Sequence, residues 1–178
     1  MTPARFSCAA AIAFFLAACA APQFRESADN VVFELAGRIA VKYRDEAASG
    51  NVAWRHSADA DEMLITSPLG GGIGRIVRTK DLVTLTTSEG HDVSARDAEA
   101  LTEQVLGFRI PLAGLADWVR GHAGPGEAVT RKDAEGRLAE LEQSGWKIEY
   151  LGWEDKLPSR MRLSYPGVEL RLAIYEWK

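Results

Sequence analysis

Residues 33–43, FELAGRIAVKY, carry a two-residue alternation of side chains that decides the fold class. Successive side chains of an extended chain point to opposite faces. One face of this stretch carries Phe33, Leu35, Gly37, Ile39, Val41 and Tyr43, and the other carries Glu34, Arg38 and Lys42. The alternation predicts a strand of an antiparallel sheet with one face on an apolar core and the other in water.

Strand-like segments with similar alternation extend along most of the chain after residue 31. Before the middle of the chain they are GNVAWRH (50–56), EMLITS (62–67), IGRIVRT (73–79) and LVTLTTS (82–88). After it they are RLAELEQ (137–143), WKIEYLGWE (146–154), RMRLSY (160–165) and VELRLAIYEWK (168–178). Short turns separate neighbouring segments, which indicates a meander, whereas residues 122–136 are interpreted as a polar connection.

Two short amphipathic helices interrupt the strands. The first is expected in SARDAEALTEQVLGF (94–108), where Ser94 and Asp97 have capping-box spacing and Gly107 is placed to end the helix. The second is expected in IPLAGLADWVRG (110–121), which begins with Pro111 near its first turn. Helices this short need tertiary support, so both are expected to lie on the sheet. The order predicts an α+β fold with one curved antiparallel sheet. Two short helices leave concave surface uncovered, which favours an apolar cavity under a helical lid.

The N-terminus has the form of a secretory signal. Residues 1–18 contain one basic residue, Arg5, followed by an apolar run and then small residues. The run ends in LAAC (16–19), which looks like a bacterial lipobox, so Cys19 is the candidate lipid attachment site. The alternative is an ordinary cleavage site that contains a cysteine by chance. We divide the chain into a signal peptide (1–18), a lipidated N-terminus and tether (19–30), and one folded domain (31–178).

Charge and motif content exclude several classes of function. The formal net charge is −4, and no run of Lys or Arg is present, which argues against nucleic-acid binding. His56, His91 and His122 are isolated from one another, so no pattern of metal ligands is present, and we expect no cofactor and no metal. The sequence SADADE (57–62) is interpreted as a solvated hairpin turn. No catalytic constellation is found, so the protein is predicted not to be an enzyme.

The segment SPLGGGIGR (67–75) places a bare leucine, Leu69, at a glycine-rich turn. Glycine adopts positive φ without steric cost, which suits a tight turn. A loop tip normally faces water and is polar, so composition alone favours a Leu69 side chain that folds back into the core. The run GGGIG is not followed by the Lys-Ser/Thr pair of a phosphate-binding loop.

Several of these segments together resemble the LolB family of outer-membrane lipoprotein receptors. The resemblance rests on GRIAV (37–41), GNVAW (50–54), SPLG (67–70), the block from residue 97 to 121 that contains IPLAGLADWVRG, and the closing YPGVELRLAIYEW (165–177). It implies an incomplete, half-open antiparallel β-barrel with a short-helix lid over a hydrophobic cavity. It also implies a monomer that accepts the acyl chains of lipoproteins from the periplasmic carrier LolA and inserts them into the inner leaflet of the outer membrane without nucleotide.

The resemblance also assigns site residues. It makes Pro68, Leu69 and Gly70 a protruding loop for membrane insertion, anchored near the outer membrane through Cys19. Candidates for the acyl-chain cavity are Ile39, Val41, Trp54, Ile65, Leu85, Leu115, Trp118, Ile148 and Leu172, although alternation alone does not separate cavity lining from core. Two other readings stay open: a structural or assembly lipoprotein that uses its sheet for protein contacts only, and a lipid-binding accessory of an enzyme.

Overall fold

Eleven strands and two helices make up the part of the chain described by the structure, a computed structural model that covers residues 30–80 and 82–178. The first six strands are β1 Val31–Tyr43, β2 Glu46–Ser57, β3 Asp61–Thr66, β4 Gly72–Thr79, β5 Leu82–Thr87 and β6 Asp92–Ala95. The helices α1 Ala98–Leu106 and α2 Leu112–Trp118 follow. The chain ends with β7 Ala128–Lys132, β8 Leu138–Gln143, β9 Trp146–Glu154, β10 Leu157–Tyr165 and β11 Val168–Trp177.

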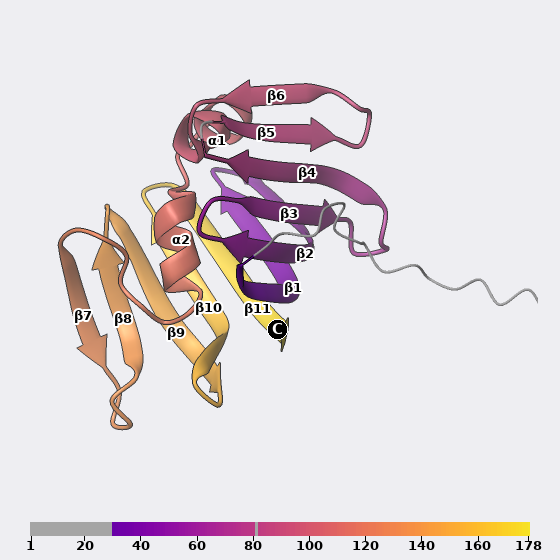
Figure 1. Cartoon of the computed structure of the whole chain (residues 1–178). Coiled ribbons are helices and arrows are strands. Elements are labelled where there is room, and N and C mark those ends of the chain that lie inside the picture. The colour runs from indigo at the N-terminus through magenta and orange to yellow at the C-terminus, as the bar shows by residue number, and fades with distance from the viewer. Residues whose placement is uncertain (1–29, 81) are drawn as a thin grey trace, which may run out of the picture.

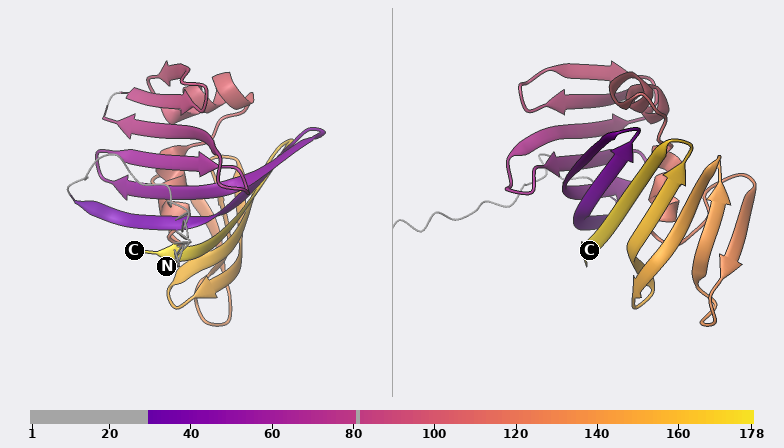
Figure 2. Two further views of the ribbon diagram at one scale, coloured as in Figure 1. Left: turned by 90° about the vertical axis from the view of Figure 1, so that its right-hand side faces the viewer. Right: turned by 180° about the vertical axis from the view of Figure 1, so that it is seen from behind.

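All eleven strands form one antiparallel sheet in the order β6-β5-β4-β3-β2-β1-β11-β10-β9-β8-β7. The sheet curves strongly, and its edge strands β6 and β7 lie at opposite ends without pairing (Figure 1). Both helices lie on the concave side, which is clearest when the molecule is turned (Figure 2). The predicted single curved antiparallel sheet, open rather than closed into a barrel, is confirmed.

The first and the last strand meet in the middle of the sheet. Strand β1 pairs with β2 on one side and with β11 on the other, and Ile39 lies opposite Leu172. The alternation that predicted β1 is confirmed, because Phe33, Leu35 and Gly37 are all buried on the concave face. Gly37 lies where the backbone of β11 leaves no room for a side chain, since a Cβ there would lie 2.5 Å from the carbonyl oxygen of Ala173.

Helix α1 begins later than the sequence predicted. Asp97 is the N-cap, and its carboxylate accepts a hydrogen bond from the backbone N–H of Ala100 at 2.7 Å. Ser94, the other proposed cap residue, lies in strand β6, with its hydroxyl 2.9 Å from that of Thr84 on β5. The predicted end at Gly107 is confirmed, because this residue has a left-handed backbone with φ 80°.

Strand β7 corrects the interpretation of residues 122–136 as a polar connection. Residues 128–132 of this segment pair with β8, and all five are exposed. An edge strand that packs on neither face lacks the apolar alternation by which a strand is predicted from sequence. Its pairing with β8 is therefore specified by backbone hydrogen bonds, which the sequence pattern does not report.

Helix α2 is fixed to the C-terminal half of the sheet by its last residue. The Trp118 ring is 1 % exposed, and its Nε1 donates a hydrogen bond to Oε1 of Gln143 at 2.8 Å. The hydroxyl of Tyr150 donates to the Trp118 carbonyl at 2.9 Å, and the Trp146 ring lies 6.4 Å from that of Trp118. These contacts from β8 and β9 explain why a seven-residue helix persists in this position.

Replacing Gly37 by Ala is expected to destabilise the protein by about 2 kcal/mol, because the added methyl group has to displace the β11 backbone. Gly72→Ala is the matched control, since a Cβ at Gly72 meets no atom within 4 Å. Urea denaturation of the two variants and the parent protein measures the difference. Equal midpoints for the two variants would contradict the close approach of β1 and β11.

Candidate functional site: the leucine loop and the concave face

The loop between β3 and β4 is closed by its own hydrogen bonds. The backbone N–H of Ser67 donates to the carbonyl of Gly71 at 2.7 Å, and that of Gly70 donates to the carbonyl of Ser67 at 2.9 Å. The Ser67 hydroxyl accepts a further bond from the N–H of Gly71 at 3.1 Å. Gly70 adopts φ +90°, a conformation that a side chain would strain. Residues 67–71, which we call the leucine loop, therefore form a defined turn.

The loop is tied to the sheet, and its apex is apolar. The side-chain amide of Asn51 on β2 donates a hydrogen bond to the Ser67 carbonyl at 3.0 Å. Leu69 is 99 % exposed, so the expectation from composition that it packs into the core is wrong. Its neighbours Pro68 and Gly70 are exposed as well. The fold thus presents one leucine side chain to its surroundings on a turn anchored at its base.

The nine proposed cavity residues all lie on strands or on α2, and the structure divides them by exposure. Four are buried in the core: Trp54, Trp118, Ile148 and Leu172. Four are partly buried and pack against it: Ile39, Val41, Leu85 and Leu115. Ile65 is half-buried and lies opposite Val52 in the register of β2 and β3, which places it on the concave face. The first group serves as core, and the partly exposed group is the part of this set that a ligand can reach.

A buried carboxylate lies at the hairpin end of β2 and β3. Asp61 is 3 % exposed, and its Oδ1 lies 2.8 Å from Nε1 of Trp54 and 2.6 Å from Nδ1 of His56. Its Oδ2 accepts a hydrogen bond from Nε of Arg78 on β4, and the two side chains form an ion pair. Burial alone would raise the pKa of Asp61, but the hydrogen bonds from His56, Arg78 and Trp54 and the charge of Arg78 outweigh it and lower the pKa.

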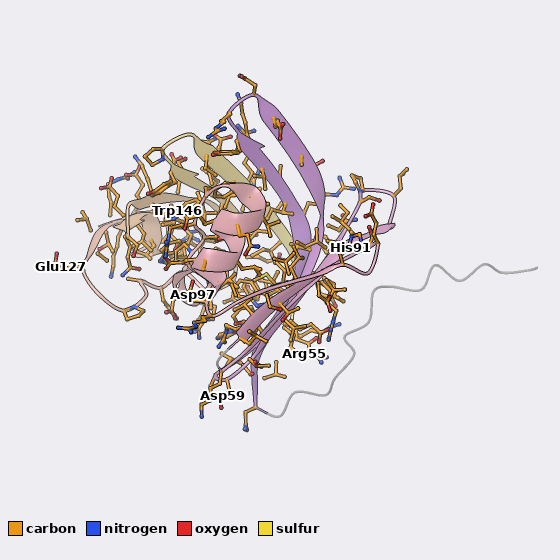
Figure 3. The ribbon with its side chains drawn as sticks, turned by 90° about the horizontal axis from the view of Figure 1, so that it is seen from above. Arg55, Asp59, His91, Asp97, Glu127 and Trp146 are labelled. Atoms are coloured by element: carbon orange, nitrogen blue, oxygen red, sulfur yellow. The ribbon has the colours of Figure 1, made fainter. Side chains whose placement is uncertain are left out.

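This cluster corrects the interpretation of residues 57–62 as a solvated turn. The turn closes at Ala60, whose carbonyl accepts from the N–H of Ser57 at 2.8 Å. Asp59 is exposed near the outer end of the hairpin (Figure 3), but Asp61 and Glu62 are buried on opposite faces of β3. His56, which the sequence left isolated, lies directly opposite Asp61 in the register. The sequence could have indicated this pair, because a turn from Ser57 to Ala60 places His56 opposite Asp61.

Among residues 30–80 and 82–178, no group of three or more His, Cys, Asp or Glu side chains is placed to hold a metal ion. In the same part of the chain, no helix is long and apolar enough to cross a membrane. Cys19, the proposed lipid attachment site, and the proposed signal peptide lie outside the described residues.

The described residues define a class of protein: an open antiparallel half-barrel with helices on its concave face, a rim of partly exposed apolar side chains, and an apolar loop tip held away from the sheet. Comparison with known proteins identifies the family. Residues 32–177 match the family described as "Outer membrane lipoprotein LolB", and the chain belongs to this family of lipoprotein-trafficking receptors.

Individual members of the family are similar to this chain over most of its length. The chain is 36% identical over 174 residues to the "Outer-membrane lipoprotein LolB" of Azoarcus sp. (strain BH72), covering 92% of this chain and 89% of the relative. It is 38% identical over 146 residues to that of Thiobacillus denitrificans, covering 81% and 78%. A crystal structure of a LolA superfamily protein from Nitrosomonas europaea aligns with a TM-score of 0.49 at 12% identity, covering 84% of this chain and 86% of that one.

Asp61→Asn is expected to lower the free energy of unfolding by about 3 kcal/mol at neutral pH, because Arg78 then stays half-buried without its counter-ion. The pKa of Asp61 is lowered in the folded state, so its contribution is complete above the ordinary value of 3.8 and is lost as the pH falls through the folded-state pKa. The penalty of the variant should therefore shrink below pH 3.8. Chemical denaturation at neutral and acidic pH measures it, with the exposed Asp59→Asn as control. A penalty that does not change with pH would contradict this assignment.

Proposed function

We propose that this protein is a lipid-anchored receptor of the outer membrane that takes lipoproteins from the periplasmic carrier LolA and inserts them into the inner leaflet, without nucleotide. The observation that carries the proposal is the 99 % exposure of Leu69 on a loop closed by four hydrogen bonds, counting the anchor from Asn51. An apolar side chain held in water has no benefit for folding, so its use lies in contact with something apolar outside the molecule.

Acceptance of cargo is assigned to the concave face. Ile39, Val41, Leu85 and Leu115 are partly buried there, and Ile65 extends this apolar surface across β3. Acyl chains gain about 0.8 kcal/mol for each CH₂ that leaves water, so even partial cover holds a lipid-modified protein in solution. Cargo has to bind here more tightly than to the carrier and less tightly than to the bilayer. Partly exposed apolar side chains, with α1 and α2 as a lid, suit that intermediate affinity.

Anchoring is assigned to Cys19, at the end of the tether that precedes the folded domain. A lipid-modified N-terminal cysteine carries more than one acyl chain, which is what stable attachment requires. The tether of 19–30 would keep the leucine loop close to the membrane surface. The protein is expected to act as a monomer, and transfer runs downhill from carrier to receptor to bilayer.

Leu69→Glu is expected to leave acceptance of cargo unchanged and to slow its insertion at least about ten-fold. Losing leucine burial and desolvating a carboxylate together cost more than about 1.4 kcal/mol, which is a factor of ten in rate. A radiolabelled lipoprotein is followed from the carrier to the full-length, processed protein and then into liposomes. Stability should change by less than about 0.5 kcal/mol, because the side chain touches nothing in the fold.

Val129→Glu is the matched control, since Val129 is 70 % exposed on the edge strand β7, remote from the loop along the sheet. Normal insertion of cargo by both variants would contradict the proposal that the leucine loop acts in membrane insertion. Failure of both variants to accept cargo would instead favour a structural lipoprotein whose sheet makes protein contacts only.

A further inference from the structure

The convex face of the sheet carries a groove that begins at the leucine loop. It has a volume of about 410 Å³ and is lined by residues of β1, β2, β9, β10 and β11. The right-hand view of Figure 2 shows these strands from behind. Its lining includes the small residues Ala40, Ser49 and Ala173. Pro68 of the leucine loop and Asn51, which anchors that loop, also line it. The groove and the apolar loop tip are therefore parts of one continuous surface.

Arginines form the walls of this groove. Arg38 on β1 and Arg160 on β10 both lie opposite Ala173 of β11, so they occupy one row of the sheet with a single strand between them. With a strand spacing of about 4.8 Å, their Cα atoms are roughly 10 Å apart, close enough for both long side chains to reach one anionic group. Arg171 lines the same groove.

Two of these arginines carry a charge that no carboxylate among residues 30–80 and 82–178 neutralises. Arg171 pairs with Glu169 at 2.8 Å, but in the described part of the chain no carboxylate forms an ion pair with Arg38 or Arg160. Both residues are exposed. Most arginines near them are paired, as Arg162 is with Glu149 at 3.1 Å. In a chain of net charge −4, two unpaired cations on one row of the sheet mark a local site for an anion.

We propose that this arginine groove binds the phosphodiester headgroups of acidic phospholipids and so aims Leu69 into the bilayer. The inference rests on the proposed function, because it supplies the orientation that the insertion step requires. Guanidinium groups match the geometry of phosphate oxygens, and cations near an acidic leaflet are attracted to its negative surface potential. The exposed Leu151 side chain also lines the groove, so apolar and cationic groups share it in the way an interfacial binding surface requires.

The test places a fluorescent, polarity-sensitive label beside the loop of the full-length protein. Gly72→Cys provides the attachment point, since a Cβ there meets nothing within 4 Å. The processed, anchored protein is reconstituted into vesicles of phosphatidylethanolamine, with or without phosphatidylglycerol. We expect the label to enter the apolar region only when phosphatidylglycerol is present. Salt at about 1 M, where the Debye length is about 3 Å, should return the label to water, because it screens the attraction between the arginines and the acidic headgroups.

The double variant Arg38→Gln and Arg160→Gln is expected to reduce the inserted population roughly ten-fold in vesicles containing phosphatidylglycerol. The control, Arg96→Gln with Lys132→Gln, removes the same charge from exposed residues elsewhere on the chain and should behave like the parent. If insertion is equal in both lipid mixtures and in both double variants, the proposal that the arginine groove binds headgroups is wrong, and the membrane role of Leu69 is unaffected. A label that stays in water in every vesicle would overturn both.

Discussion

The pairing of β1 with β11 holds the molecule together. It joins a meander of six strands, β1 to β6, to a meander of five, β7 to β11, into one sheet. Leu170, Leu172 and Ile174 of β11 are buried on the concave face beside the apolar row of β1. Two features of the candidate site depend on this pairing, since the arginine groove crosses it on the convex side and the apolar core crosses it on the concave side.

Most of the strands that the sequence predicted have one face on the core. The alternation in β1, β9 and β11 followed directly from the requirement that apolar side chains lie on the core. Strand β7 was missed because it lies at the edge of the sheet with all five residues exposed, so its pairing rests on backbone hydrogen bonds. Strand β6 was missed because four residues are too short to display an alternation, although Val93 and Ala95 pack against the core. Ser94 was wrongly proposed as a helix cap for a related reason. A serine just before a helical segment has the same sequence context whether it caps the helix or lies in an edge strand, as Ser94 does in β6.

The candidate site was predictable in part. The exposure of Leu69 followed from the resemblance to the LolB family and not from composition, which assigned the leucine to the core. The division of the nine concave-face residues into core and rim was beyond reach, since both groups alternate with the same period. The arginine groove was also missed. Arg38 and Arg160 are 122 positions apart in the chain, and only the pairing of both their strands with β11 brings them together.

The central position of the last strand has a consequence for how the chain folds. Residues 168–177 form the last of the eleven described strands in chain order, yet they fill the middle of the sheet rather than its edge. Until they arrive, β1 has one open side and β10 another, and both apolar faces lack their neighbour. Pairing of residues so distant in sequence is slow, and unpaired strand edges invite association between chains. A chain of this design is exposed to such association until residues 168–177 have paired with both neighbours, so the insertion of one strand completes both halves of the sheet at once.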